Sequence, residues 1–345
     1  MTKPRIAVLA LGGTIAMVKG DAGGVRPGLG ADDLVAAVPG IDAIADLQAE
    51  TISRISSSDL TVPAVLAVAR RIEALAAAGA IDGAVVTQGT DTMEESSFLL
   101  DLVLTSSIPV VVTGAMRNPL SVSHDGPGNV LAAVRVAADP TVRAHAHSIG
   151  VLVVMLDNIH AAVNVAKATS TRIDAFTSPE TGPVGILVED RVRLSSVPNR
   201  DYRTALETET DGGPDMTGDI PSVALHTLAM GESGGLLKAL IANPDTLGYA
   251  GLVLGATGGG HAPEWLVEPL ETLAKRVPVV MAGRMQAGYL LAKTYERAGS
   301  EIDLINRGIV SAGRLPPLKA RLLLTVMLTA GLDAEAQARV WATLN

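Results

Sequence analysis

The chain has 345 residues, contains no cysteine and has a formal net charge of −9 at pH 7. This length provides material for two domains or for one large domain. The absence of cysteine excludes disulfides, thiolate zinc sites and a cysteine nucleophile. The negative charge argues against nucleic acid and against an anionic membrane as partners, because both need a basic face.

Composition also limits the class of fold. Hydrophobic residues make up 48% of the chain but aromatic residues only 2%, so the core must consist mainly of Ala, Val, Leu and Ile. The 35 glycines fit a fold with many turns between strands and helices. No apolar run reaches the ~18 residues of a membrane span, and residues 6–11 are too few for a typical signal peptide. We therefore expect a cytoplasmic protein.

Short apolar runs alternate with helical patterns in the first half of the chain. The apolar runs are residues 6–11, 84–86, 109–112 and 149–155, and helical spacing is found over 66–78, 96–104 and 130–138. This alternation is typical of βαβ units. We therefore predict an α/β fold whose larger N-terminal part is a doubly wound, flavodoxin-like parallel sheet.

The pattern breaks between residues 195 and 222. Turn-forming segments at 198–201 and 211–215 predict a linker with at most one short strand. A second, shorter alternation of strands and helices follows, and two helices at 317–328 and 334–344 close the chain. The predicted domains are an N-terminal α/β domain (1–195), a linker (196–221) and a smaller C-terminal α/β domain (222–345).

Two predicted strands of the N-terminal part end in turns rich in glycine and threonine. The run 6–11 stops at Gly12-Gly13-Thr14, and the run 84–86 leads into Gly89-Thr90-Asp91. In a parallel sheet both turns lie at the carboxyl edge, where α/β proteins bind ligands. A single threonine at such a place is most often a helix N-cap. The pair, together with an Asp and a more distant Lys, indicates a hydroxyl nucleophile with its own base.

One further motif offers a different interpretation. Gly231-Glu232-Ser233-Gly234-Gly235 matches the nucleophile elbow of serine hydrolases, and Asp245 and His261 follow in the required order. The region is too short for the sheet that usually surrounds this motif, so a serine hydrolase is a minor alternative. A nucleotide-binding module has less support, because the chain has neither a G-x-G-x-x-G motif nor a P-loop.

Several motifs occur in the order found in one known enzyme family. They are Gly12-Gly13-Thr14-Ile15-Ala16, Gly89-Thr90-Asp91-Thr92-Met93-Glu94-Glu95, Gly114-Ala115-Met116-Arg117, Asp125-Gly126-Pro127, Lys167 and Lys319-Ala320-Arg321. In these residues, which extend over nearly the whole chain, the protein resembles the bacterial-type L-asparaginases. The resemblance implies hydrolysis of L-asparagine to L-aspartate and ammonia through a threonine acyl-enzyme, without metal or organic cofactor. It also implies a homotetramer formed by two intimate dimers.

The resemblance also implies roles for individual residues. The implied catalytic residues are Thr14, Thr90, Asp91, Lys167 and Glu301. Thr14 is expected to be the nucleophile, Lys167 a base beside Thr90, and Glu301 a group supplied by a neighbouring subunit. The implied substrate-binding residues are Gly13, Ser57, Ser58, Gly89, Thr90, Asp91, Ala115 and His261. Asp91 would bind the substrate α-ammonium group, although a carboxylate near Lys167 also favours the protonated amine.

Two segments, residues 18–30 and 56–59, each have a functional and a purely structural interpretation. Residues 18–30 contain five glycines and no apolar periodicity. They are predicted to form a mobile lid over the site at Thr14, with an ordinary surface loop as the alternative. Residues 56–59, which include Ser57 and Ser58, also fit an N-cap before a helix at 62–78.

Three positions depart from the family pattern. The family uses a lid tyrosine to polarise the first threonine, but residues 18–30 contain none. Ser58 stands where asparaginases commonly have Gln, and His261 stands where the family has an Asn from the adjacent subunit. Two alternatives to a specific asparaginase stay open. One is a glutaminase-asparaginase of broader specificity, and the other is an asparaginase-like protein that binds an amino acid or amide with weak turnover.

Overall fold

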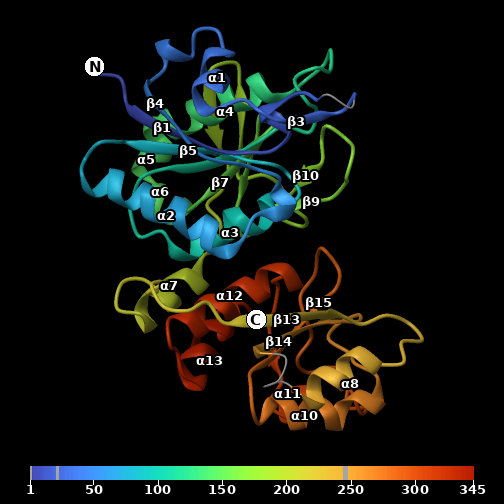
Figure 1. The fold of residues 1–345 in the computed structure, drawn as a ribbon. Coiled ribbons are helices and arrows are strands. Elements are labelled where there is room, and N and C mark those ends of the chain that lie inside the picture. Colours follow the sequence, from blue (N-terminus) through green and yellow to red (C-terminus); the bar gives the residue numbers. More distant parts are fainter. Residues whose placement is uncertain (1, 21–22, 244–247) are drawn as a thin grey trace. The chain divides into compact units, whose positions relative to one another are not determined.

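The computed structural model describes residues 2–20, 23–243 and 248–345. The chain divides into two compact units, Met1–Asn199 and Arg200–Asn345, which are both visible in Figure 1. Each unit is an α/β structure with its own sheet. The predicted fold class, a larger N-terminal sheet with a smaller C-terminal α/β domain, is therefore confirmed.

The N-terminal unit contains an eight-stranded sheet with the order β12-β11-β8-β7-β6-β5-β1-β4. Its strands are β1 (Arg5–Gly12), β4 (Asp46–Ile55), β5 (Gly83–Thr87), β6 (Val110–Thr113), β7 (Leu152–Met155), β8 (Asn158–Ala161), β11 (Gly185–Val188) and β12 (Arg191–Leu194). Strands β4, β1, β5, β6 and β7 are parallel. Antiparallel pairing then joins β8 to β7, β11 to β8 and β12 to β11. In chain order the parallel strands read second, first, third, fourth, fifth, which is the flavodoxin-like arrangement.

Helices cover both faces of this sheet. They are α1 (Ala31–Ala36), α2 (Val62–Ala77), α3 (Met93–Val103), α4 (Gly126–Ala138), α5 (Pro140–Ala144) and α6 (Ala146–Ile149). Helices α1 and α4 pack together on one face, whereas α2 and α3 pack together on the other (Figure 1). Every residue of β5, β6 and β7 is buried, as expected for parallel strands between two helical layers.

The segment predicted as a lid contains a small hairpin. Strand β2 (Met17–Lys19) pairs antiparallel with β3 (Val25–Pro27), and residues 21–22 lie outside the described part of the chain. The backbone N–H groups of Gly28 and Leu29 both donate to the Ala16 carbonyl, at 2.9 and 3.0 Å. The base of the hairpin is therefore bonded to the short helix η1 (Thr14–Ala16) that follows β1.

The N-cap predicted at residues 56–59 is wrong. Ser57–Asp59 form a separate 3₁₀ turn, η3, and α2 begins only at Val62. Its N-cap is Thr61, whose hydroxyl accepts a hydrogen bond from the Ala64 N–H at 3.4 Å. Proline in the first helical turn also favours this start, because its missing N–H is not needed there.

The segment predicted as a linker contains a helix rather than a short strand. Helix α7 (Asp201–Glu209) lies within it and packs against α13 (Ala334–Ala342). Tyr202 and Leu206 are spaced four residues apart and are both fully buried, so they form one apolar stripe. This single pair is too short a pattern to stand out among the surrounding turn residues.

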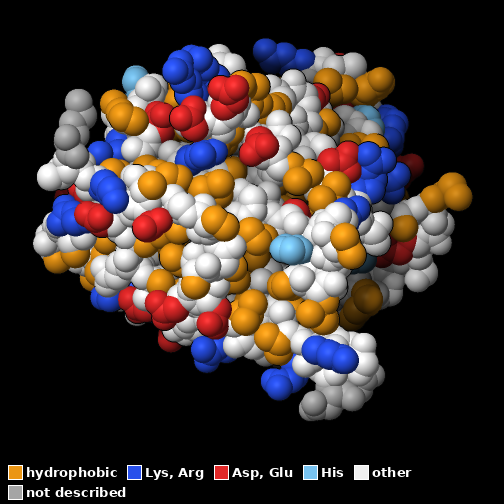
Figure 2. Space-filling view, turned by 90° about the horizontal axis from the view of Figure 1, so that it is seen from above, with side chains coloured by type: hydrophobic (Ala, Val, Ile, Leu, Met, Phe, Trp, Pro, Cys, Tyr) orange, Lys and Arg blue, Asp and Glu red, His pale blue; other side chains and the backbone are white. Residues whose placement is uncertain are grey.

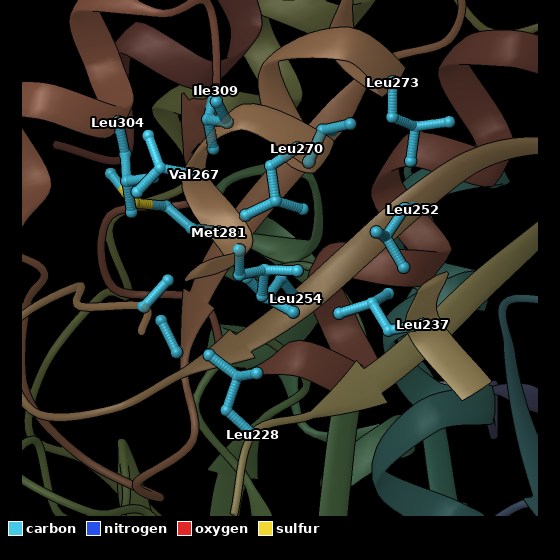
Figure 3. Packing of buried hydrophobic residues seen from close by; sticks show 14 of the residues in the cluster. Leu228, Leu237, Leu252, Leu254, Val267, Leu270, Leu273, Met281, Leu304 and Ile309 are labelled. Carbon is cyan, nitrogen blue, oxygen red and sulfur yellow. The ribbon is translucent and has the colours of Figure 1, made fainter. Parts of the chain in front are cut away.

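The C-terminal unit has a four-stranded parallel sheet in the order β13-β14-β15-β16. Its strands are β13 (Ser222–Thr227), β14 (Tyr249–Ala256), β15 (Val279–Gly283) and β16 (Val310–Ser311), and its other helices are α8 (Gly235–Ala242), η4 (Glu264–Leu266), α10 (Val267–Ala274), α11 (Glu301–Asn306) and α12 (Pro317–Thr329). Figure 3 shows Leu252, Leu254 and Met281 of the strands packed against leucines of α8, α10 and α11. Helix α12 also contacts β13, β14 and β15.

Figure 2 views the protein from the side of α1 and the hairpin. Acidic and basic side chains are interspersed on this face, with hydrophobic side chains between them. None of the helices within the described ranges is both long enough and apolar enough to cross a membrane.

The imidazole of His160 in β8 is buried, and its protonation is linked to the stability of the fold. Its side chain is 3% exposed, and its Nδ1 lies 2.8 Å from the Ser178 hydroxyl. Its Nε2 is buried and has no hydrogen-bond partner among the described residues. Burial lowers the pKa of His160 from 6.5 to about 4, because the imidazolium form would lose its hydration.

We predict that the free energy of unfolding falls as the pH drops from about 6.5 to about 4. In that range the unfolded chain binds a proton at residue 160 and the folded chain does not, so acid favours unfolding by about 1–3 kcal/mol. Urea unfolding at pH 7 and at pH 5 should therefore show a smaller pH effect in His160→Gln than in the parent. His145→Gln, which changes an exposed histidine, is the control, and equal pH effects in all three chains would contradict the prediction.

Candidate active site

The two glycine-threonine turns lie side by side at the switch point of the sheet. Strands β1 and β5 are direct neighbours, and α/β proteins of this strand order bind ligands between them. The backbones of Gly13 and Gly89 are in close contact: a Cβ atom on Gly13 would lie 2.1 Å from the Gly89 nitrogen. Gly13 also has a φ of 84°, which favours glycine. The predicted proximity of the two turns is therefore seen in the structure.

The two threonines have different surroundings. Thr14 is the first residue of η1 and is half-buried, whereas Thr90 is only 5% exposed. The Thr90 hydroxyl lies 2.9 Å from the Lys167 ammonium. The structure gives the Thr14 hydroxyl no hydrogen-bond partner among the residues it describes. The threonine with a neighbouring amine is thus Thr90.

Lys167 also forms an ion pair with Asp91. Its Nζ lies 2.6 Å from Asp91 Oδ1, and the Lys167 side chain is 12% exposed while that of Asp91 is 65% exposed. The Lys167 ammonium, hydrogen-bonded to this carboxylate, holds the pKa of Asp91 below its usual range. Thr90, Asp91 and Lys167 therefore form one contiguous group, with its amine enclosed and its carboxylate open to solvent.

Glu94 supports Lys167 from a second direction. Lys167 ends the short strand β9 (Ala166–Lys167), which pairs antiparallel with β10 (Phe176–Thr177). The backbone N–H of Lys167 donates to Glu94 Oε2 at 3.3 Å. The sequence identified Glu94 only as a member of a motif, four residues after Thr90, and gave no sign of its bond to Lys167.

Ser57 holds the Asp91 segment in place. It is 6% exposed, and its hydroxyl accepts from the Asp91 N–H at 3.2 Å and lies 3.3 Å from Asp91 Oδ2. Its carbonyl accepts from the Thr92 hydroxyl at 2.9 Å. The neighbouring Ser58 hydroxyl instead lies 2.9 Å from that of Ser56. Of the two predicted serines, Ser57 is therefore the one bonded to the Thr90–Asp91 turn.

The loop around Ala115 is fixed by buried polar side chains. Ala115 is 1% exposed, and the carbonyl of the preceding Gly114 accepts from Asn129 at 2.9 Å. The Asp125 carboxylate accepts from the N–H groups of Met116 at 3.0 Å and Arg117 at 2.9 Å, and from Asn129 at 2.9 Å. Asn129 was not predicted, because nothing in the sequence distinguishes it from other helix residues.

Glu301 and His261 lie together in the C-terminal unit. Glu301 Oε1 accepts from the N–H groups of Thr294 at 2.8 Å and Tyr295 at 2.7 Å, and its Oε2 lies 3.6 Å from His261 Nδ1. Burial raises the pKa of Glu301, but these backbone bonds outweigh it and leave the pKa below its usual value. The His261 ring meets the Tyr295 ring edge to face at 5.1 Å.

The Glu301 side chain is 0% exposed within its own chain. Its expected contribution to a second subunit's site therefore stays a prediction.

The nucleophile-elbow motif does not form a triad in the described part of the chain. Ser233 is exposed and lies in the loop between β13 and α8. Its neighbour Glu232 pairs instead with His226 at 2.8 Å. His261 lies beside Glu301, and Asp245 is outside the described residues.

Comparisons with known proteins agree with this arrangement. Residues 5–200 match the family model "Asparaginase, N-terminal", and residues 222–340 match "Glutaminase/Asparaginase C-terminal domain". The chain belongs to the asparaginase family. L-asparaginase 2 of Escherichia coli is 34% identical over 96% of this chain and 91% of its own length. A glutaminase-asparaginase of Pseudomonas fluorescens is 31% identical over 99% of this chain and 91% of its own length.

A solved structure shares the fold of this asparaginase-family chain. It is a probable cytoplasmic L-asparaginase from Campylobacter jejuni, with a TM-score of 0.84 and 32% identity, and the similarity covers 99% of both chains. A curated relative from Haemophilus influenzae, 34% identical over 96% of this chain and 90% of its own length, is described as a probable periplasmic L-asparaginase.

Replacing Lys167 tests the importance of the enclosed amine. Lys167→Met keeps most of the stem volume and removes the amine, so we expect kcat for asparagine to fall by at least ~10²-fold with little change in KM. Ammonia release gives both constants. Lys275→Met, which changes a 71%-exposed lysine, should leave them unchanged. A rise in KM alone would identify Lys167 as a binding or structural charge.

Proposed function

We propose that the protein hydrolyses L-asparagine to L-aspartate and ammonia through an ester at Thr14, without metal or organic cofactor. The main support is the contact of Lys167 with Thr90 and Asp91 beside the Thr14 turn. Relatives similar over nearly the whole chain, named L-asparaginases, support the substrate.

The proposed reaction has two stages. The Thr14 hydroxyl oxygen attacks the side-chain amide carbon of asparagine and loses its proton, and backbone N–H groups at the glycine turns stabilise the oxyanion. The C–N bond then breaks, and the leaving nitrogen takes up the proton that Thr14 lost and departs as ammonia. Water attacks the resulting ester, which restores Thr14 and releases aspartate. Lys167, acting with Thr90, would accept and return the protons.

Asp91 has two partners in this mechanism. Its carboxylate is mostly exposed, so the α-ammonium group of an incoming substrate can reach it, whereas the Lys167 amine is enclosed. A second cation beside Asp91 would compete with Lys167 for the carboxylate and weaken the contact between the two side chains. Substrate binding would thereby prepare the base. Gly13, Ser57, Ser58, Gly89 and Ala115 complete the proposed substrate site in this unit.

Two alternative functions have specific support. Ser58 is smaller than the Gln that asparaginases commonly have, which leaves room for glutamine, and some relatives are named glutaminase-asparaginases. The Thr14 hydroxyl has no partner in the described part of the chain, which favours weak turnover. Ammonia release from asparagine and from glutamine, measured beside calorimetric binding of L-aspartate, separates the three functions. Binding without ammonia release would contradict the proposed hydrolysis.

We further propose a cytoplasmic homotetramer, with Glu301 and His261 contributed to the site of a neighbouring subunit. The cytoplasmic description of the Campylobacter protein supports the cytoplasmic location.

We also propose the domain boundaries 1–195 for the N-terminal domain, 196–221 for the linker and 222–345 for the C-terminal domain. The second family match begins at residue 222, which supports the last of these boundaries.

Removing either threonine hydroxyl should stop turnover without unfolding the chain. We expect Thr14→Ala and Thr90→Ala each to reduce kcat by at least ~10²-fold, because each removes a proton-transfer group. The melting temperature should stay close to that of the parent. Thr105→Ala, at an exposed position, is the control for activity. Near-full activity of Thr14→Ala would exclude it as the nucleophile.

Mixing two inactive variants tests whether subunits share a site. Thr14→Ala and Glu301→Gln chains, unfolded and refolded together, should recover about one quarter of parent activity, because random pairing gives one site in four with both residues intact. Glu301→Gln keeps an acceptor for the two backbone N–H groups, so its fold should be retained. If each chain owns its whole site, the mixture should stay inactive.

A further inference from the structure

An apolar pocket lies in the N-terminal unit next to the turn that follows β1. Its cavity volume is about 70 Å³, and it is partly open to solvent. Its walls come from four elements or their flanks, and they include Ile15, Leu29, Leu34 and Val130. Pockets that bind small molecules have mostly apolar walls, and at ~10–15 Å³ for each water-sized site this space holds a molecule of roughly five to seven non-hydrogen atoms. The size and lining therefore fit a small ligand.

The ionisable residues that line the pocket are both basic. They are Arg117 and His124, and no acidic side chain is among the lining residues. Arg117 donates through Nη1 to the carbonyl and hydroxyl of Ser123, which restrains the guanidinium. The nearby Asp125 carboxylate is 7% exposed and is directed to backbone N–H groups.

Arg117 has no carboxylate partner among the described residues. Several other arginines of the chain do have one: Arg5 pairs with Asp82, and Arg71 pairs with Glu50. A guanidinium without a counter-ion beside an apolar pocket is complementary to a ligand with one anionic end and one apolar end.

We propose that this pocket binds a short aliphatic monocarboxylate, with its chain between Ile15, Leu34 and Val130 and its carboxylate on Arg117. An amino acid fits less well, because its ammonium group would find no acidic residue in the lining. The pocket shares Ala115 with the proposed asparagine site but differs from it in chemistry, because Asp91 is available there for the ammonium group.

The pocket and the proposed catalytic turn share a wall. Ile15 lines the pocket and directly follows Thr14, and Leu29 lines it while its N–H bonds to the Ala16 carbonyl. A bound chain would contact Ile15, the residue that follows Thr14. Binding should therefore alter the KM for asparagine, a consequence that rests on the proposed function.

Binding can be measured without any reaction. In calorimetric titrations of the full chain with acetate, butyrate and hexanoate, affinity should rise about threefold to fourfold per added methylene as apolar surface is buried. Hexanol and hexylamine, which have the same chain without the anion, should bind at least ~10-fold more weakly than hexanoate. Equal affinities across the acids, or hexanol binding as well as hexanoate, would overturn the proposal.

Variants locate the site. Arg117→Gln should weaken hexanoate binding by at least ~10-fold, because it removes the charge-assisted hydrogen bonds. Arg135→Gln is the matched control, since Arg135 lies on α4 outside the pocket lining and bonds to the Glu189 carbonyl. Both variants should melt at the parent temperature, which shows that they fold.

Competition separates this site from the substrate site. Hexanoate should remain bound in the presence of saturating L-aspartate. If L-aspartate displaces it and Arg117→Gln has no effect, hexanoate occupies the substrate site and the proposal is wrong. A chain that binds hexanoate through Arg117 but releases no ammonia from asparagine would refute the proposed function and leave this site intact.

Discussion

The contact between the backbones of Gly13 and Gly89 is the constraint on which the candidate site depends. Neighbouring parallel strands bring their carboxyl ends together, but side chains at these ends would normally keep the turns apart. Here neither turn has a side chain at the point of contact. A Cβ atom on Gly89 would also lie 2.6 Å from the Ser57 hydroxyl, so three chain segments meet at this place. The relative position of the two turns is therefore set by contacts between their backbones and not by the functional side chains.

Burial then divides the charges of the site into an inner and an outer group. The amine of Lys167 is enclosed between Thr90 and Asp91, and Glu94 fixes the backbone from which it extends. The Asp91 carboxylate is exposed on its other side. An enclosed charge interacts strongly with its few neighbours, while an exposed one can exchange partners at little cost. This difference suits a base that must stay in place and an anion that must meet a substrate.

Most of the fold could be predicted because its signals are local. The continuous apolar runs that become β1, β5 and β6 are strong signals, and strands separated by helices indicate parallel pairing. Predictions failed where local patterns were short or ambiguous. The apolar run at 149–155 was predicted as one element, but it contains the last residue of α6 as well as strand β7. Helix α6 ends at Gly150, which has a positive φ, and β7 begins at Leu152. Helix α7 depends on a contact with α13 that no nearby residue reveals.

The candidate site was predictable in part for the same reason. The two turns could be placed from periodicity, but Lys167 lies in a two-residue strand and was found only through the family resemblance. The support from Glu94 joins a side chain to the backbone of a residue 73 positions away. Bonds of this kind leave no periodic pattern in a sequence. The enclosure of Glu301 was likewise not foreseen, since acidic residues are most often exposed.

The central place of β1 in its sheet has a consequence for how the chain assembles. Both edges of β1 are paired, one with β4 and one with β5. Strand β1 precedes both of its partners in the chain, so both of its edges can be covered only after residue 87 has been synthesised. Until then the unpaired backbone of β1 can pair with strands of other chains. Detachment of β1 from the folded sheet would likewise expose one edge of β4 and one edge of β5. Refolding of this unit should consequently be sensitive to protein concentration.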